Sequence, residues 1–334
     1  MSTRSTAPAT TPIAIYYEHP SWFGPLFDEL ERRGIAHHRL HVEDHSYDIA
    51  DPRPPYSLLF NRISPSAFTR GHSGAIFYTL QYLAHLEKLG VKVINGYECF
   101  ATEISKARQL ALFAQEGLPA PPSRLIHNAS AAAQLAEGLS FPIIFKPNIG
   151  GSGAGIRKFE SAADLREAAE ENDLDFGLDG TALLQEFVPA AESRIVRVEV
   201  VGGRYLYAIR IYMQGDGAFN LCPGSICMGV GGDELERSAY PEDAPKNDLY
   251  VEGYEPPQEI VDQVERIMAA AHVDVGGIEY VVDARDGRHY FYDLNALSNF
   301  VADAPNVVGF DPFSRLVDYL VEEADRASNG NGAG

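Results

Sequence analysis

The 334-residue chain has few cysteines and no long apolar run. Its three cysteines (Cys99, Cys222 and Cys227) fit no disulfide framework, and a reducing compartment suits them. No apolar stretch approaches the roughly 20 residues that a membrane-spanning helix needs. The polar N-terminal segment MSTRSTAPATTP also lacks the apolar core of a signal peptide. These absences predict a cytoplasmic protein without a membrane partner.

Positive charge is scarce as well, because 27 lysines and arginines stand against 47 acidic residues and give a net charge of −20. Nucleic acid and anionic membranes both require a basic face, so we expect neither as the main partner. Only six of the basic residues are lysines, which makes the position of each one informative. The sequence also shows no Ser-His-Asp or Cys-His arrangement that would indicate a covalent nucleophile.

Short apolar strands alternate with amphipathic helices over residues 12–100. The pattern reads in turn as strand, helix, strand, helix and strand at residues 13–17, 22–33, 56–63, 76–89 and 91–95. Such an alternation predicts a small parallel α/β domain. Because open α/β sheets bind ligands at the carboxyl ends of their strands, Arg62 is a candidate for holding a substrate carboxylate. A structural salt bridge is the alternative for this residue.

Residues 141–156, FPIIFKPNIGGSGAGI, combine an apolar strand that carries Lys146 with a loop rich in glycine. Glycines let backbone N–H groups approach phosphate oxygens closely, and a lysine on the preceding strand adds a positive charge. The spacing matches neither a Walker A loop nor a dinucleotide-binding fingerprint, and the loop alone also suits a plain hairpin. Downstream, the short strand 183–188 ends on Gln185 and Glu186, and its backbone offers groups that can pair with the edge of adenine.

Residues 276–299, GGIEYVVDARDGRHYFYDLNALSN, predict a β-hairpin with an Asp-Gly turn. Asp293 and Asn295 are two residues apart and share one face of the second strand. A turn with an odd number of residues would place Glu279 opposite Asp293, whereas a two-residue turn would place it on the other face. If the face is shared, the cluster has no nearby lysine to neutralise it and suits a hard divalent cation. The alternative is three solvated polar residues.

The order of these features resembles the ATP-grasp superfamily, and within it the RimK-type α-L-glutamate ligases and the glutathione-synthetase-like carboxylate–amine ligases. The resemblance covers residues 56–325, including NRI at 61–63 and the segment 90–123. It implies an α/β (α+β) ATP-grasp fold, with the nucleotide bound between two α+β subdomains. The units expected are a disordered tail at 1–12, an N-terminal parallel α/β (pre-ATP-grasp) domain at 13–104, a nucleotide-binding subdomain with a glycine-rich lid at 105–188, a catalytic subdomain at 189–326 and a disordered tail at 327–334.

The resemblance also implies which residues would bind the nucleotide. Lys106 and Lys146 would contact the phosphates of ATP. The lid that closes over them would consist of Gly150, Gly151, Ser152, Gly153 and Gly155. The adenine-binding hinge would consist of Gln185, Glu186, Phe187 and Val188. Glu192 would take the place of an aspartate near the ribose, because this chain has Ile195 at the usual position.

For the reaction itself, the resemblance assigns Arg197 and Asn220 to the reacting groups. Glu279, Asp293 and Asn295 would bind two Mg²⁺ ions, with Mn²⁺ as an alternative. The implied activity joins a small-molecule carboxylate to an amine through an acyl phosphate, releasing ADP and phosphate. We expect an amino acid and a second amino acid or small peptide as substrates, and a homo-oligomer, either dimer or tetramer. The alternatives are an ATP-grasp small-molecule kinase and a nucleotide-binding protein without turnover.

Overall fold

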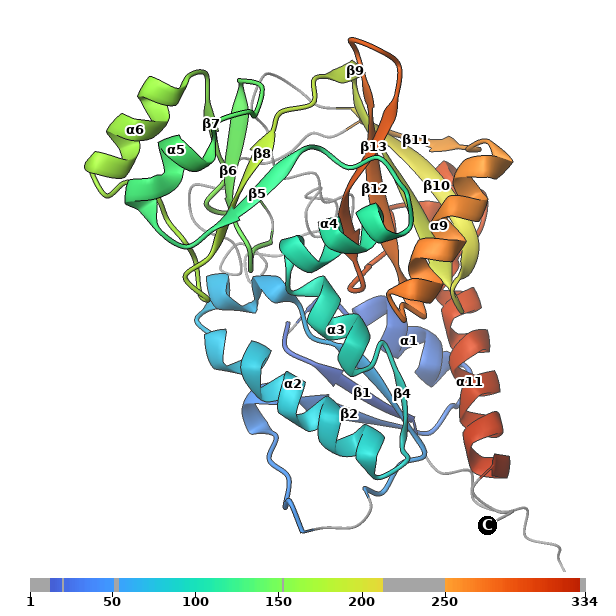
Figure 1. The fold of residues 1–334 in the computed structure, drawn as a ribbon. Coiled ribbons are helices and arrows are strands. Elements are labelled where there is room, and N and C mark those ends of the chain that lie inside the picture. The colour runs from blue at the N-terminus through green and yellow to red at the C-terminus, as the bar shows by residue number, and fades with distance from the viewer. Residues whose placement is uncertain (1–12, 20, 51–53, 152, 213–249, 331–334) are drawn as a thin grey trace, which may run out of the picture.

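The computed structural model describes residues 13–330 except for residues 20, 51–53, 152 and 213–249. The described residues form three sheets, which are β2-β1-β3-β4, β5-β8-β6-β7 and β11-β10-β9-β12-β13. In Figure 1 the first sheet lies at the bottom, and the other two lie above it on the left and right. Within the part of the chain so described, no helix is both long and apolar enough to cross a membrane.

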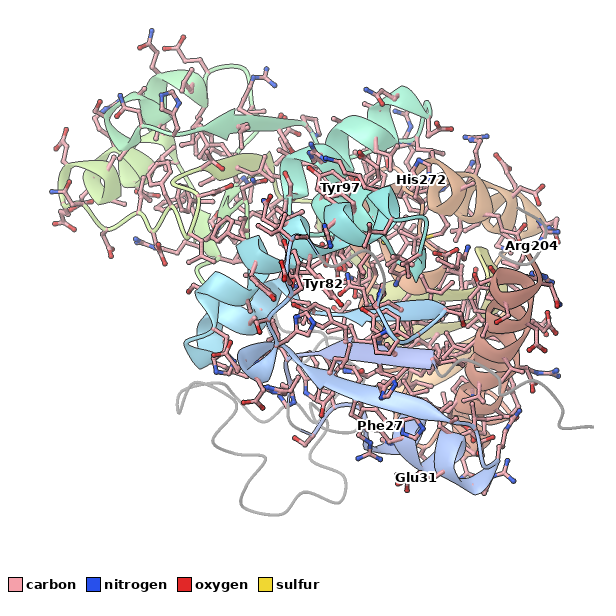
Figure 2. All side chains as sticks on the ribbon, turned by 90° about the horizontal axis from the view of Figure 1, so that it is seen from below. Phe27, Glu31, Tyr82, Tyr97, Arg204 and His272 are labelled. Atoms are coloured by element: carbon pink, nitrogen blue, oxygen red, sulfur yellow. The ribbon has the colours of Figure 1, made fainter. Side chains whose placement is uncertain are left out.

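All strands of the first sheet are parallel, as the sequence predicts for the N-terminal domain. Its elements are β1 (Ile13–Tyr17), α1 (Gly24–Arg32), β2 (His37–His41), η1 (Val42–Asp44), β3 (Leu58–Arg62), η2 (Pro65–Arg70), α2 (Ser73–Lys88) and β4 (Lys92–Ile94). Because side chains alternate along each strand, one face packs on α1 and α11 and the other on α2. Figure 2 shows this for α1, where Phe27 is turned toward the strands and Glu31 away from them.

Two helices, α3 (Tyr97–Glu103) and α4 (Lys106–Gln115), lead from this domain to the second sheet. That sheet pairs all its strands antiparallel. Its elements are β5 (Ser123–Ile126), η3 (Ala129–Ala131), α5 (Ala132–Leu135), β6 (Ile143–Pro147), β7 (Arg157–Phe159), α6 (Ala162–Glu170) and β8 (Ala182–Glu186). A separate apolar core joins α5 and α6 to the strands.

The third sheet is also antiparallel. Its unit contains β9 (Ala190–Val201), β10 (Arg204–Tyr212), β11 (Tyr250–Tyr254), α9 (Gln258–Ala270), β12 (Val275–Asp283), β13 (His289–Asn295), α10 (Ala304–Val307) and α11 (Pro312–Gly330). On β9, Val196, Val198 and Val200 pack in a core with α4 and α9. The intervening residues, Arg197 and Glu199, therefore point to the opposite face, where the polar site described below is built.

The strand β2 (His37–His41) of the first sheet was not expected from the sequence. Two further elements were expected in another form. The segment 215–257 reads as a loop because it is rich in Gly, Pro and acidic residues, yet Tyr250–Tyr254 forms the edge strand β11 against β10. Residues 327–330 read as part of a polar tail, yet α11 continues through Gly330. Tertiary pairing stabilises β11, and an amphipathic helix already docked on the core extends into polar sequence.

Candidate active site

The β12–β13 hairpin places Glu279 and Asp293 opposite each other in the antiparallel pair. Asn295 lies two residues beyond Asp293 and shares its face. The pairing is irregular next to Glu279, where Tyr292 is the extra residue of a β-bulge. The register that the sequence left open therefore brings the two carboxylates and the amide to one face of the sheet.

Glu279 is buried, and both of its carboxylate oxygens accept hydrogen bonds. Oε1 accepts from Arg197 Nη1 at 2.9 Å, and Oε2 accepts from the hydroxyl of Tyr292 at 2.8 Å. Burial raises the pKa of Glu279, the charge of Arg197 opposes this, and the Asp293 carboxylate raises the pKa further. Neighbouring carboxylates of this kind gain most from a cation that binds both.

Asp293 contacts a lysine that the sequence places far away. Oδ1 of Asp293 accepts a hydrogen bond from Lys106 Nζ, across a separation of 187 residues, and Oδ2 accepts from Asn295 Nδ2 at 3.1 Å. The expectation that no lysine lies near this cluster is therefore wrong, because it considered only neighbours along the chain. The fold brings a phosphate-binding candidate directly to a metal-binding candidate.

Asn148 explains why the two predicted phosphate-binding lysines come together. It lies two residues after Lys146 on the way into the glycine loop, and its backbone carbonyl accepts from the N–H of Lys106 at 3.2 Å. Its side-chain Oδ1 accepts from the N–H of Ala107 at 2.9 Å and from the hydroxyl of Ser105 at 3.1 Å. The start of α4 is thus held against the end of β6. The sequence analysis missed Asn148, which has no signal apart from its place next to the loop.

Lys146 is buried beside this junction. Burial first, and the charge of Lys106 second, lower the pKa of Lys146 to about 8, although Asp293 and Glu279 oppose the shift. In the free protein, Lys146 therefore loses its proton in a pH range where a lysine in water keeps it. Phosphate oxygens beside the amine would favour the charged form and return the pKa toward its ordinary value.

We expect the affinity for ATP to weaken as the pH rises through 8. Above this pH the free protein must take up a proton at Lys146 in order to bind the phosphates. With a pKa of about 8, the Kd for ATP should rise about fivefold between pH 8 and pH 9. Calorimetry in buffers of different ionisation enthalpy measures both the affinity and the proton uptake.

Lys146→Arg is the matched control, because arginine keeps its charge throughout this range. Its Kd should not change between pH 8 and pH 9. A wild-type Kd that is equally constant, without proton uptake, would contradict the expectation that Lys146 is deprotonated in the free protein and protonated against the phosphates.

The glycine-rich loop lies against the N-terminal domain. A Cβ added to Gly151 would lie 2.7 Å from Cβ of Ser66 in η2, which leaves no room for a side chain. Gly153 and Gly155 have φ angles of 74° and 72°, a region that favours glycine. Gly150 is in the same loop, whereas Ser152 lies outside the described residues. The loop therefore forms a close backbone contact with η2.

The predicted adenine hinge consists of the last two residues of β8 and the two residues that follow it. The buried side-chain amide of Gln185 donates to Ser123 Oγ at 3.0 Å, and the backbone N–H groups of Glu186 and Phe187 donate to carbonyls of adjacent segments. These bonds order the connection from β8 to β9 at Val188. Lys158, which the sequence analysis did not single out, lies 4.6 Å from the centre of the Phe187 ring.

Arg197 is held by two carboxylates. Its Nε donates to Glu199 Oε1 at 2.6 Å, in addition to the bond from Nη1 to Glu279. Burial by itself would lower the pKa of Arg197. The charges of Glu199 and Glu279 outweigh this and hold the pKa above its usual range. A Cβ on Gly277 would lie 2.9 Å from Nη2 of Arg197 and from both oxygens of Glu199. The sequence analysis missed Glu199, for which the two-residue spacing from Arg197 along β9 is the signal.

Arg62 takes a different position from the one expected of a residue that binds a substrate carboxylate. It is 3% exposed, and its guanidinium donates to the backbone carbonyls of Ala296 (Nη1, 3.3 Å) and Ser298 (Nη2). These acceptors are carbonyls, and no described carboxylate forms an ion pair with Arg62, so the alternative of a structural salt bridge is not seen in the described part of the chain either. Burial lowers the pKa of Arg62 to about 10. Arg62 joins the N-terminal domain to the segment that directly follows Asn295.

Two further predicted site residues are not members of the described cluster, one because of its position and one because it is not described. Glu192 is exposed, and its carboxylate pairs with Arg194 Nη1 at 2.7 Å. Asn220 lies outside the described residues. The described cluster therefore consists of Lys106, Lys146, Arg197, Glu279, Asp293 and Asn295, with Glu199 and Tyr292 as further members.

Residues 104–234 match a family described as the RimK-like ATP-grasp domain. A probable alpha-L-glutamate ligase of Serratia proteamaculans is 28% identical over 229 residues, which is 64% of this chain and 71% of that protein. The ribosomal protein bS6–L-glutamate ligase of Escherichia fergusonii is 30% identical over 168 residues, 49% of this chain and 55% of that protein.

Solved structures show the same fold over nearly the whole chain. The ATP-grasp ligase PsnB, complexed with a minimal precursor, has a TM-score of 0.65 at 20% identity and covers 93% of this chain and 99% of its own. The D-cycloserine synthetase DcsG also has a TM-score of 0.65, at 17% identity, and covers 93% and 99%. Residues 104–234 of this chain thus match the RimK-like ATP-grasp domain, and the chain shares the fold of the ATP-grasp ligase PsnB over nearly its whole length.

Proposed function

We propose that the protein joins a carboxylate to an amine in an ATP-dependent reaction through an acyl phosphate. The observation that supports this most is that two lysines, Lys106 of α4 and Lys146 of β6, meet an arginine and two carboxylates that share one face of the third sheet, directly beside a glycine-rich loop. Phosphoryl transfer is catalysed mainly by positioning and charge neutralisation, for which such an arrangement is suited. No covalent nucleophile is required.

In the first step a carboxylate oxygen of the acid attacks the γ-phosphorus, and ADP leaves. In the second step the amine attacks the carbonyl carbon, phosphate leaves, and the nitrogen loses a proton. Lys106 and Lys146 would bind the phosphate oxygens, and Arg197 would face the oxygens on which charge develops. The glycine-rich loop would exclude water, which would otherwise hydrolyse the acyl phosphate.

Glu279, Asp293 and Asn295 offer the oxygen ligands that Mg²⁺ prefers, so the donor set fits this metal. In the structure these carboxylates are paired with Arg197 and Lys106, and a metal ion would add further positive charge to them. Magnesium bound here would neutralise the β- and γ-phosphates. We propose two ions, with Mn²⁺ as a substitute.

Adenine would bind at the hinge. The backbone N–H groups of Glu186 and Phe187 already donate to protein acceptors. The hydrogen bonds to the edge of adenine would therefore come from the backbone of Val188 and from the carbonyls of this segment. The substrates proposed are an amino acid and either a second amino acid or a peptide. The chain is similar to proteins named as glutamate ligases and to the ligase PsnB, whose structure contains a precursor. These similarities are the basis for the proposed substrates.

The experiment that tests the function is ADP release with Mg²⁺ and ATP across amino acids and dipeptides, supplied singly and in pairs. A ligase releases ADP only with a pair, and its product has the mass of both partners less water. Release with a single hydroxyl compound, giving a phosphorylated product, would instead show a kinase. ATP binding without any release across the panel would favour a nucleotide-binding protein.

A further inference from the structure

The N-terminal domain carries a second polar cluster, at the carboxyl end of its parallel sheet. The chain passes from β1 outward to β2 and returns to β3 on the other side of β1. In open parallel sheets, ligands bind outside the carboxyl ends of the strands at such a reversal of strand order. Glu18 and His19 follow β1 at this point, and Ser64 follows β3.

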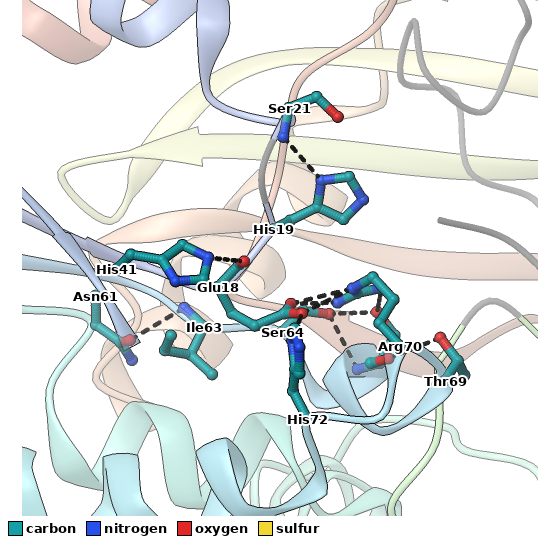
Figure 3. Close-up of polar contacts among 11 residues, drawn as sticks. Glu18, His19, Ser21, His41, Asn61, Ile63, Ser64, Thr69, Arg70 and His72 are labelled. Carbon is teal, nitrogen blue, oxygen red and sulfur yellow. Dashed lines mark hydrogen bonds and ion pairs between the residues drawn. The ribbon is translucent and has the colours of Figure 1, made fainter. Parts of the chain in front are cut away.

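An ion cluster forms the base of this region. Glu18 is fully buried and accepts from Arg70 Nε at 2.9 Å and from His72 Nδ1 at 2.6 Å, as Figure 3 shows. Burial alone would raise the pKa of Glu18, but the hydrogen bond and charge of Arg70 lower it below its usual range. Glu18 thus holds Arg70 in place, and the guanidinium of Arg70 lies 5.1 Å from the centre of the Trp22 ring.

His19 and Trp22 present two N–H donors for which the described residues supply no acceptor. Their rings stack with centroids 4.1 Å apart and an interplanar angle of 9°. Nδ1 of His19 accepts from the N–H of Ser21 at 3.3 Å, which places the proton of the neutral ring on Nε2. Burial first, and the charge of Arg70 second, lower the pKa of His19 to about 3, so the ring is neutral at neutral pH.

Both donor atoms, Nε2 of His19 and Nε1 of Trp22, are buried and have no hydrogen-bond partner among the described residues. In Figure 3 the second ring nitrogen of His19 is joined to none of the residues drawn. A buried donor without an acceptor is costly, and the two here lie on neighbouring rings. Two unpaired N–H donors beside the positive charge of Arg70 favour the binding of a hydrogen-bond acceptor that carries negative charge.

The cluster also lies next to the glycine-rich loop. Arg70 Nη1 donates to Ser66 Oγ at 3.2 Å, and Ser66 is the residue against which Gly151 packs. A substrate enclosed by this loop would therefore have η2 and the end of β1 within reach.

We propose that His19 and Trp22 form a subsite for the free carboxylate of an amino-acid or peptide substrate, namely a carboxylate that is not phosphorylated. The two N–H groups donate to its oxygens, and Arg70 supplies the positive potential. The proposal rests on the proposed ligase function and adds to it the group by which one substrate is recognised. It also replaces Arg62, which is engaged by backbone carbonyls, as the carboxylate-binding element of this domain.

Trp22 is the single tryptophan of the chain, so its fluorescence reports directly on the subsite. The full-length protein is titrated with amino acids and dipeptides, with their C-terminal carboxamides, and with inorganic phosphate. We expect saturable changes in emission with free acids and at least roughly tenfold weaker binding of the carboxamides. Equal responses to acid and carboxamide would overturn the proposal, and saturation by phosphate alone would identify a phosphate site instead.

His19→Phe keeps the stacked ring and removes the donor, and Trp22→Phe does the same for the indole N–H. Each should raise the KM of the acid-bearing substrate roughly 10- to 100-fold and leave the KM of ATP unchanged. His127→Phe, at an exposed position, is the matched control. Melting temperatures establish that each variant is folded.

Unchanged substrate KM values in both folded variants would show that the two donors hold only buried water. The subsite would then fail while ligase activity remains. Conversely, saturable quenching by acids without any ADP release would retain the subsite and reject the ligase function.

Discussion

Glu279→Gln should lower the rate of ADP release roughly 10²–10³-fold or more while the protein remains folded. The carboxylate lies opposite Asp293 and is the buried member of the proposed metal-binding set. Glutamine has the same shape and can still accept from Arg197, but its neutral amide is a far weaker ligand for Mg²⁺. The measurements are ADP release, Mg²⁺-dependent nucleotide binding by calorimetry, and the melting temperature.

Glu265→Gln is the matched control, because Glu265 is a partly exposed carboxylate of the same unit, away from the cluster, and pairs with the exposed Arg204 at 2.7 Å. An exposed pair of this kind contributes little, so turnover should stay within about twofold of wild type. If Glu279→Gln keeps its turnover and its affinity for Mg²⁺, the metal assignment on this hairpin is wrong.

Arg197→Lys should lower kcat about 10²-fold with little effect on the affinity for ATP. Lysine keeps the positive charge, so Glu199 and Glu279 do not become unpaired buried charges. It lacks the planar fork, however, and cannot donate to Glu199 at 2.6 Å and Glu279 at 2.9 Å while presenting a further N–H to the substrate. Steady-state kinetics with the substrate pair identified by the ADP-release panel measure the split between kcat and KM.

Arg204→Lys, at an exposed arginine on the neighbouring strand, should behave as wild type. A rise in the KM for ATP with kcat unchanged in Arg197→Lys would place Arg197 at the nucleotide instead of the reacting groups. If both variants show wild-type kinetics, Arg197 does not contribute to the reaction through its guanidinium.

The β12–β13 hairpin shows which features of the site the local sequence pattern predicts and which it does not. The alternation of side chains places Asp293 and Asn295 on one face without any tertiary information. The face of Glu279 depends on one residue of register, which the β-bulge at Tyr292 decides in favour of Asp293. Turn composition alone left this open, because the same Asp-Gly dipeptide serves loops of different length.

The cationic partners of the carboxylates were beyond the reach of local pattern. Lys106 meets Asp293 because Asn148 holds the start of α4 against the end of β6. Arg62 ends a strand in the way ligand-binding residues do, yet packing of the domains buries it against the carbonyls of Ala296 and Ser298. The contacts of Lys106 with Asp293 and of Arg62 with Ala296 join residues 187 and 234 apart in the chain, so no spacing in the sequence reports them.

By itself, the sequence determined the parallel N-terminal sheet, the glycine-rich loop after Lys146 and the carboxylate hairpin, since strand period, turn chemistry and the conformational freedom of glycine act over a few residues. The tertiary structure decided which distant charges face one another, namely Lys106 with Asp293 and Arg197 with Glu279. The physical reason is that the two kinds of interaction act over different ranges of sequence separation. Propensities are local, whereas electrostatic and packing energies depend on distances that are defined only once the chain is folded.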